Sequence, residues 1–229
     1  MRYKSFVFPR SACPDCGHIL GWYDLIPVFS WFFLGGKCRY CKAAISWLYP
    51  FIEVFTALVM SALLVFVPLI YFPAYFLFFS ALIVTIRTDI ESMLILQIAT
   101  LYLVPVGFLL SAFGFLPISF YDSLGGSLIG YGFLYVFAWV FKRLTGKEGI
   151  GAGDFDLLAF IGAFTGIMGC WLSLFLGSVI GSFVGLFMGL LGKMDRSAKI
   201  PFGPFLAIGA ILYVLFNKQI LALLFKISL

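Results

Sequence analysis

Charged residues are scarce in this sequence. Asp, Glu, Lys and Arg together make up 11% of the 229 residues, whereas 63% of the residues are hydrophobic. A soluble domain of this length wraps its core in a charged surface, and so few charges cannot form one. The shortage excludes an ordinary soluble globular protein, and the mean hydropathy of +1.11 indicates that the lipid bilayer is the partner of most of the chain.

Three further features are missing. The basic residues are scattered over loops without forming a stripe, so the net charge of +5 does not indicate a nucleic-acid partner. The first 11 residues contain no apolar run, which argues against a secretory signal peptide. The glycine-rich segment before Asp154 lacks the lysine and the Ser or Thr of a phosphate-binding P-loop.

Long apolar runs are abundant instead. About 20 apolar residues cross a bilayer as a helix, and seven stretches qualify, some of them short. The predicted fold class is therefore all-α, a polytopic transmembrane helix bundle with about seven spans. Pro68 and Pro73 predict a tight turn after the first span, and Gly169 with Cys170 predicts one after the fifth. We place the spans at Leu48–Ile70, Phe72–Ile86, Met93–Leu116, Leu124–Phe141, Phe155–Gly169, Leu172–Leu191 and Phe202–Phe216. The apolar tail Ile220–Phe225 is either an interfacial helix or an extension of the last span.

The basic residues predict the orientation of these spans. Positively charged loops stay in the cytoplasm, and the connections on the opposite side contain no Lys or Arg. The N-terminal segment is therefore expected to lie in the cytoplasm. Thirteen of the 15 basic residues fall on that side if the spans alternate: Arg2, Lys4, Arg10, Lys37, Arg39, Lys42, Arg87, Lys142, Arg143, Lys147, Lys193, Arg196 and Lys199.

Four cysteines form two Cys-x-x-Cys motifs in the N-terminal segment. Cys13 and Cys16 are separated from Cys38 and Cys41 by 21 residues, which is close to the spacing of a four-cysteine zinc ribbon. Gly17 permits the backbone conformation that such a turn requires. Persistent disulfides are not expected in the cytoplasm, so the spacing favours structural Zn²⁺ over free thiols.

This segment predicts a small domain of its own. We divide the chain into a cytoplasmic four-cysteine, zinc-binding module at residues 1–46 and a transmembrane domain at residues 47–229. Zinc would fold a module too small to fold by itself. His18 is interpreted as a bystander because four thiols are already available, and Cys170 is assigned no role.

Five of the ten acidic residues lie within or beside the predicted spans. A carboxylate in that position is costly and indicates function. These five are Glu53, Asp89, Glu91, Asp154 and Asp156. Solvation explains the others, which are Asp15, Asp24, Asp122, Glu148 and Asp195.

Asp89 and Asp154 are predicted to lie at the same membrane depth on different helices. Two close carboxylates can share one proton, so that the ionised one activates water and the protonated one polarises a peptide carbonyl. Gly151 and Gly153 remove side chains from the backbone before Asp154, which would let an extended peptide approach. The alternative is that Asp154 caps the fifth helix, and the residues themselves leave both interpretations open.

The segment Gly151-Ala152-Gly153-Asp154 matches the G-x-G-D signature of intramembrane aspartyl proteases. Along nearly its whole length the chain resembles the bacterial type IV prepilin peptidases. The N-terminal residues that carry the resemblance are Cys13-Pro14-Asp15-Cys16-Gly17-His18, Trp22-Tyr23-Asp24, Ile26-Pro27, Ser30-Trp31, Cys38-Arg39-Tyr40-Cys41, Ile45-Ser46, Tyr49-Pro50 and Glu53. Those in the membrane domain are the stretch from Gly146 to Asp154 and Ile200-Pro201-Phe202-Gly203-Pro204-Phe205.

The resemblance implies an activity and its residues. It assigns the catalytic roles to Asp89 and Asp154, with Glu91 as the second acid of the first motif. It implies cleavage of a basic leader from type IV prepilins or pseudopilins at the cytoplasmic membrane face. It also implies N-methylation of the new amino terminus, with S-adenosylmethionine as donor, although no methyl-donor site is recognisable in the sequence. We expect Glu53 to support the site by orienting Lys147 or another base.

Three departures from the family pattern are visible. Members usually begin with a transmembrane helix, and residues 1–11 contain no such run. The lysine expected two residues after the second aspartate is Asp156, which lies roughly 200° around a helix from Asp154. The Pro-Asp expected after the first motif is Leu96-Gln97, which could change how the third helix begins.

Two other classes compete with a protease. A proton-coupled transporter would distribute carboxylates through the membrane depth, whereas Asp89, Glu91, Asp154 and Asp156 gather at one side. A non-catalytic scaffold of a pilus or secretion machine gains support only from the three departures. Glycines recur every four residues in the sixth span, which predicts tight internal packing or a dimer face: Gly177, Gly181, Gly185 and Gly189.

Overall fold

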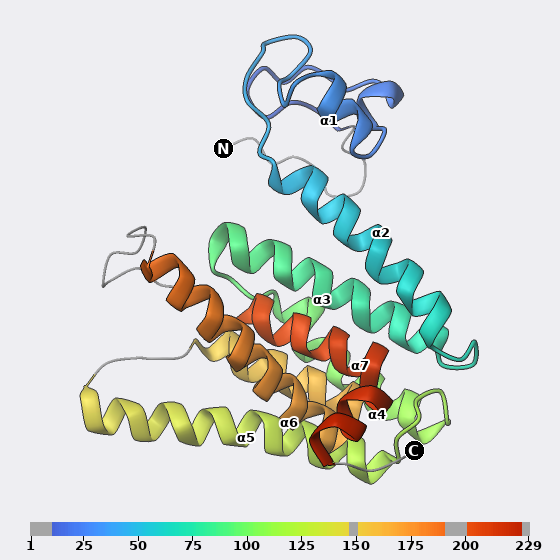
Figure 1. Cartoon of the computed structure of the whole chain (residues 1–229), viewed down its shortest axis with the longest axis vertical. Helices are drawn as coiled ribbons and strands as arrows, with labels where there is room; N and C mark the ends of the chain where they lie inside the picture. The colour runs from blue at the N-terminus through green and yellow to red at the C-terminus, as the bar shows by residue number, and fades with distance from the viewer. Residues whose placement is uncertain (1–10, 147–150, 191–200, 226–229) are drawn as a thin grey trace. The chain divides into compact units, whose positions relative to one another are not determined.

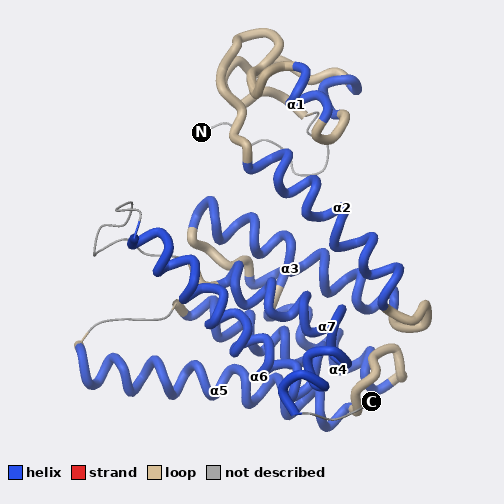
Figure 2. The backbone as a smooth tube through the Cα atoms, viewed as in Figure 1, coloured by secondary structure: helices blue, strands red, loops and turns tan. Residues whose placement is uncertain are grey.

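The computed structural model describes residues 11–146, 151–190 and 201–225. Over these ranges the chain is built from helices and loops, and strand pairing is limited to isolated bridges (Figure 2). The predicted all-α fold class is therefore confirmed. The chain divides into two compact units, Met1–Leu58 and Val59–Leu229.

The N-terminal unit contains two knuckles with the same backbone design. In the first, the Cys13 N–H donates to the His18 carbonyl and the Gly17 N–H donates to the Cys13 carbonyl, both at 2.9 Å. The second repeats the two bonds, from the N–H groups of Cys38 and Lys42, at 2.8 and 3.0 Å. Gly17 and Lys42 both adopt positive φ, at 70° and 62°. The turn predicted at Gly17 is confirmed, and its second copy lies at Lys42.

A 3-10 turn, η1 (Trp22–Leu25), and a short helix, α1 (Phe29–Phe33), lie between the two knuckles. The Trp31 indole N–H donates to the Ile45 carbonyl at 3.1 Å, which ties α1 to the segment after the second knuckle. Only small elements form here, so the module depends on such cross-links rather than on a large apolar core.

Five of the described helices are long and apolar enough to cross a membrane. They are α2 (Leu48–Phe66), α3 (Phe72–Ser92), α5 (Phe120–Thr145), α6 (Ala152–Leu190) and α7 (Gly203–Phe225), and Figure 1 shows their paths. Pro73 in the first turn of α3 confirms the tight turn predicted there. Helix α7 continues to Phe225 across a break in helical geometry at Phe216, so the interfacial helix and the extension of the last span both stay predictions for this tail.

The prediction of one continuous third span at Met93–Leu116 is wrong. Met93 ends α3 in a left-handed conformation, with φ 53°. Two 3-10 turns follow, η2 (Gln97–Ala99) and η3 (Leu101–Leu103), before the nine-residue helix α4 (Val104–Ala112). Thr100 separates the two turns with non-helical backbone angles, and Pro105 begins α4. Apolar composition alone did not reveal these local breaks.

Helix α3 also runs beyond its predicted end at Ile86. It continues to Ser92, so Arg87 and Asp89 lie inside a helix rather than in a connection. The last turn is therefore a rigid element that carries the first of the two predicted catalytic carboxylates.

Helix α6 consists of two arms that reverse at Gly166, three residues before the predicted turn at Gly169 and Cys170. Gly166 has φ 72° and ψ −174°, a region that is essentially restricted to glycine. The thiol of Cys170 lies 4.0 Å from the Leu158 carbonyl, which is incompatible with one straight helix. The Ile167 N–H donates to the Asp122 carboxylate at 3.1 Å. Asp122 therefore fixes the reversal, a role that the prediction of simple solvation missed.

Replacing Gly166 by alanine is expected to destabilise the fold by about 1–3 kcal/mol, because alanine is strained at this backbone conformation. The new methyl group would also collide with the Asp122 carboxylate. Thermal unfolding of the purified protein in detergent measures the effect. Gly189→Ala in the second arm is the matched control, because among the described residues no atom lies within 4 Å of the new methyl position. Equal destabilisation by the two variants would contradict this explanation.

The first arm of α6 forms the centre of the membrane unit. Phe160 and Phe164 are fully buried, and their rings pack on Phe78 of α3 at 5.1 and 5.0 Å between centroids. Ser123 of α5 donates to the Ala163 carbonyl at 2.5 Å. Because Asp154 begins this buried arm, packing with α3 and α5 sets its position.

The second arm of α6 packs closely on α7 at two glycines. A methyl group on Gly177 would lie 2.9 Å from the Phe205 carbonyl oxygen, and one on Gly209 would lie 3.0 Å from the Gly177 nitrogen. The predicted internal packing is therefore confirmed at Gly177.

Candidate active site and metal centre

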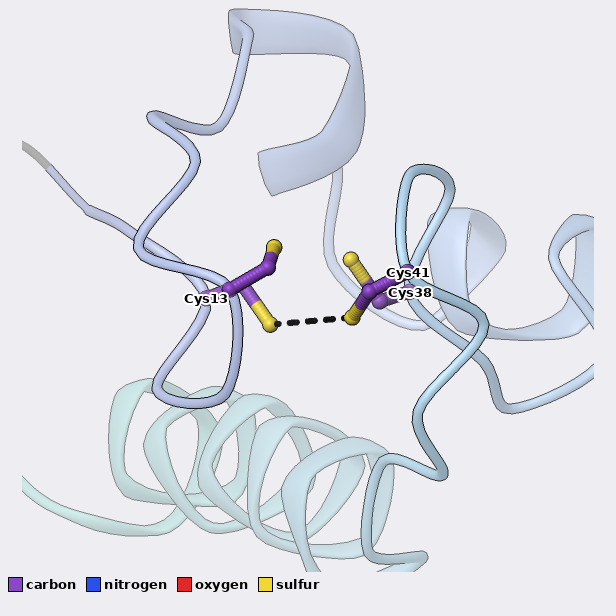
Figure 3. A group of neighbouring side chains, drawn as sticks. Cys13, Cys38 and Cys41 are labelled. Atoms are coloured by element: carbon purple, nitrogen blue, oxygen red, sulfur yellow. Dashed lines mark hydrogen bonds between the residues drawn. The ribbon is translucent and has the colours of Figure 1, made fainter.

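The four predicted metal ligands form one cluster in the N-terminal unit. The sulfur atoms of Cys13, Cys16, Cys38 and Cys41 all lie within 4.8 Å of one another. Figure 3 shows the thiol of Cys13 facing those of Cys38 and Cys41, and its sulfur lies 3.8 Å from that of Cys41. A tetrahedral zinc site with bonds of about 2.3 Å has sulfur atoms about 3.8 Å apart. The donor set and its spacing therefore fit a four-coordinate metal ion.

Local backbone groups favour the thiolate form at Cys38. Hydrogen bonds from the backbone of Cys41, and then of Tyr40, lower the pKa of the Cys38 thiol to about 7. Thiolates, not thiols, bind metal ions. His18 lies outside the cysteine cluster and packs on the Tyr40 ring, with 3.5 Å between ring centroids. That packing agrees with its interpretation as a bystander.

Asp89 lies in the last turn of α3 and is 5% exposed. Its carboxylate accepts a hydrogen bond of 3.1 Å from the N–H of Gly203, the first residue of α7. Free N–H groups at a helix N-terminus stabilise a nearby carboxylate. The position of Asp89 is therefore determined by two helices at once.

Asp154 is the third residue of α6 and is 9% exposed. Its N–H donates to the Gly151 carbonyl at 3.1 Å, and its carboxylate lies against the backbone of the same glycine. Ile95 lies against both Gly153, the neighbour of Asp154, and Gly203, the partner of Asp89, so the surroundings of the two acids meet at one side chain. Asp154 is thus not the residue that precedes the helix, a place that Gly151 takes, and it contributes to the cap only through the Gly151 backbone. Asp154 and Asp89 are both buried, as the catalytic alternative requires.

Ile95 connects the surroundings of the two carboxylates. A methyl group on Gly153 would lie 2.9 Å from the Ile95 Cβ atom, and one on Gly203 would lie 3.2 Å from its Cδ1 atom. The space beside Gly153 is therefore filled by the protein itself, whereas the sequence suggested access for a peptide. Both contacts close the site on the side of the α3–α4 connection.

Two family models match the chain. The bacterial peptidase A24 N-terminal domain matches residues 1–67, and the type IV leader peptidase family matches residues 76–186. A prepilin leader peptidase/N-methyltransferase of Aeromonas salmonicida is 39% identical over 225 residues, which cover 96% of this chain and 75% of the relative. This chain belongs to the type IV leader peptidase family.

Relatives from other genera carry the same name. The prepilin leader peptidase/N-methyltransferase of Pseudomonas aeruginosa is 37% identical over 94% of this chain and 74% of its own length. That of Burkholderia pseudomallei is 37% identical over 97% of this chain and 72% of its own length. No solved structure matches the chain.

In this leader peptidase family member, the other predicted supporting residues make contacts of their own or lie outside the described residues. Glu91 pairs with Arg87 on the same helix at 2.5 Å. Glu53, in the N-terminal unit, accepts a bond of 2.7 Å from the Val28 N–H. Lys147 lies outside the described residues, so its predicted contact with Glu53 stays a prediction.

Sequence reasoning missed three residues near the aspartates. Ile95 packs against Gly153 and Gly203, and the Gly203 N–H donates to Asp89. Neither residue type indicates such a role in the sequence. Gln97 was noticed only as a departure from the family pattern, but its side chain donates to the Asp156 carboxylate at 3.3 Å. For Gly203, a signal was present in the sequence, because the segment of residues 200–205 at the start of the last helix carries part of the family resemblance.

Proposed function

We propose that this chain is a membrane aspartyl endopeptidase that removes the leader from type IV prepilins or pseudopilins and then N-methylates the new amino terminus. The observation that carries the proposal is the pair of buried carboxylates, Asp89 from α3 and Asp154 from α6, whose adjacent glycines both lie against Ile95. Membership of the leader peptidase family and the names of the relatives support both activities. Cleavage of a membrane-embedded prepilin by the purified protein tests it.

The proposed cleavage uses the two aspartates as an acid–base pair. The ionised carboxylate removes a proton from water, which attacks the scissile carbonyl, while the protonated carboxylate donates a hydrogen bond to the carbonyl oxygen. The tetrahedral intermediate then breaks down when the leaving amine receives a proton and the peptide bond opens. The buried positions of both side chains keep bulk water from weakening these interactions.

We propose Zn²⁺ as the ion of the four-cysteine cluster. The separation of 3.8 Å between the Cys13 and Cys41 sulfur atoms supports a tetrahedral thiolate site. All four positions belong to cysteines, so no coordination site is left for catalysis and the ion would be structural. The ion would hold together the proposed module of residues 1–46, separate from the membrane domain of residues 47–229.

The proposed methyl donor is S-adenosylmethionine. The N-terminal unit contains a cavity of about 490 Å³ whose lining includes the aromatic residues Trp31 and Tyr49 and the acids Asp24 and Glu53. Small-molecule sites commonly enclose about 300–1,000 Å³. Arg39 also lines the cavity and pairs with Asp24 at 2.8 Å, which leaves Glu53 as the carboxylate for a cationic ligand. Glu53 with the faces of Trp31 and Tyr49 suits a cation that carries an aromatic base, so these three residues fit the group. When bound, the donor would supply an electrophilic methyl group, and the aromatic residues would hold its base.

Trp31→Ala is expected to weaken binding of S-adenosylmethionine about tenfold or more, because loss of a stacking face costs about 1–3 kcal/mol. Equilibrium dialysis with labelled S-adenosylmethionine measures binding independently of methylation. Phe33→Ala is the matched control, since Phe33 lies on the same short helix and is 88% exposed. Unchanged binding in a Trp31→Ala protein that retains its metal would rule out this cavity.

The proposed location is a bacterial inner membrane with the module and both aspartates at the cytoplasmic face. The distribution of basic residues supports this orientation, since 13 of 15 fall on one side of the predicted spans. The cytoplasmic face is also where a basic leader would remain before cleavage.

A further inference from the structure

A hydrogen bond connects the segment after Asp89 to the helix that carries Asp154. The Gln97 amide nitrogen donates to the Asp156 carboxylate at 3.3 Å, between residues 59 positions apart in the chain. Gln97 begins η2, which follows α3 after a loop of four residues, Met93 to Leu96. Asp156 lies two residues beyond Asp154 in α6 and is 7% exposed. The contact is thus adjacent to both predicted catalytic residues without including either.

The same short segment makes a second contact with α6. Ile95 packs against Gly153, the residue immediately before Asp154. Ile95 and Gln97 therefore contact the beginning of α6 on either side of Asp154 in sequence, one through packing and one through a polar bond. Together these contacts fix how far the α6 start can slide or rotate relative to the end of α3.

We propose that Gln97 and Asp156 are positioning residues that hold Asp154 in register with Asp89. The inference rests on the proposed function, in which these two aspartates perform the cleavage. Asp156 does not itself touch the reacting atoms, because it points roughly 200° around the helix from Asp154. It acts through the backbone of the first turns of α6.

Burial of Asp156 explains why this contact is polar, although Gln97 itself is exposed. An ionised carboxylate removed from water is stable only with hydrogen-bond donors or opposite charges nearby. The Gln97 amide supplies a donor to Asp156, so moving the α6 start away from η2 would leave a buried carboxylate without it. That penalty opposes small displacements that an apolar contact would tolerate.

The two members of the contact have complementary roles. Gln97 on the α3–α4 connection supplies the donor, and Asp156 on α6 supplies the acceptor. A change at either position therefore alters the contact as a whole, so the two positions act as one coupled pair.

The coupling predicts the outcome of a double-mutant cycle in cleavage of a membrane-embedded prepilin. Gln97→Asp places a second carboxylate against Asp156 and is expected to lower kcat about tenfold or more, since small misplacements of reacting groups cost up to about 10²-fold. The double variant Gln97→Asp/Asp156→Lys forms an ion pair and should recover to within about threefold of the original kcat. KM should change little in all variants, because the pair does not contact the substrate.

A conservative variant separates charge from hydrogen bonding. Asp156→Asn keeps an acceptor oxygen for Gln97 and should retain most of the original kcat, whereas Asp156→Ala should lose activity about as much as Gln97→Asp. Gln219→Asp adds the same charge at an exposed position of α7 and is the control for added charge alone. Thermal unfolding of each variant shows whether it is folded.

The alternatives give distinct results. If the effects of the two single substitutions simply multiply in the double variant, or if no single variant lowers kcat, the positioning role is wrong. If a single variant fails to fold, the proposal still requires the double variant to fold and to cleave. Retained cleavage in Asp89→Asn or Asp154→Asn would instead overturn the proposed function. If both of these variants lose cleavage but the double-mutant cycle shows no coupling between Gln97 and Asp156, only the positioning role is overturned.

Discussion

Asp89→Asn and Asp154→Asn variants are each expected to lose cleavage of a membrane-embedded prepilin, with kcat lower by about 10²–10⁴-fold, the usual contribution of a general acid or base. Asparagine matches the shape of aspartate but can neither remove a proton from water nor exist as an acid. Both carboxylates are buried, so bulk water does not replace the lost function. A time course of leader removal by the purified proteins measures the effect.

The same substitutions should leave the fold intact. The amide oxygen of an asparagine at position 89 can still accept the bond from the Gly203 N–H, and one at position 154 can still lie against Gly151. Thermal unfolding in detergent should therefore change little. The double variant should be no slower than the worse single variant, because residues that act as a unit are not additive. A folded single variant that cleaves at the original rate would show that the pair is not the catalytic site.

If Asp154 were only a cap, a different result would follow. Loss of a cap costs about 0.5–2 kcal/mol of stability, and it would appear as earlier unfolding with cleavage largely preserved in the remaining folded protein. Catalysis predicts the reverse, with a normal unfolding temperature and no cleavage. The two measurements on one variant therefore decide between the interpretations that the sequence left open.

The sequence predicted those features that depend on composition or on short spacing. Apolar runs predicted α2, α3, α5 and both arms of α6, and the two Cys-x-x-Cys motifs predicted a cluster that the structure forms. The equal membrane depth of Asp89 and Asp154 also follows from the alternation of the spans, and it stays a prediction. None of these signals depends on the exact first and last residues of the predicted helices.

The sequence did not predict features that depend on three-dimensional contacts. The break at Met93–Leu116 arises from local backbone geometry around Met93 and Thr100, within a stretch that is apolar throughout. The reversal of α6 lies at Gly166 because Asp122 of another helix binds the Ile167 N–H, and no pattern within α6 indicates that partner. The Gln97–Asp156 contact spans 59 residues for the same reason.

Removal of the metal is expected to unfold the N-terminal module while the helices of the membrane unit remain. Structural zinc contributes about 10–16 kcal/mol of apparent binding free energy in small domains, more than such a module gains from its own core. Over residues 11–46 the module has only the short elements η1 and α1 and two isolated bridges, which are too few to stabilise it without the metal ion. Treatment with a strong chelator should therefore make the segment around Trp22 and Trp31 sensitive to protease and change its tryptophan fluorescence.

Cysteine variants locate the ion. Cys13→Ser and Cys38→Ser should each lower the zinc content of the purified protein from about one ion per chain to nearly none, because a four-thiolate site that loses one ligand loses much of its affinity. Cys170→Ser is the matched control, since Cys170 is a buried cysteine of the membrane unit that lies outside the cluster. Elemental analysis measures the metal, and a thiol reagent should find the four cysteines protected before chelation and reactive after it. Equal zinc loss in the Cys170→Ser protein, or zinc-free protein with a protease-resistant module, would contradict a structural zinc site, because only ligation by the four clustered thiols couples metal content to the folding of residues 11–46.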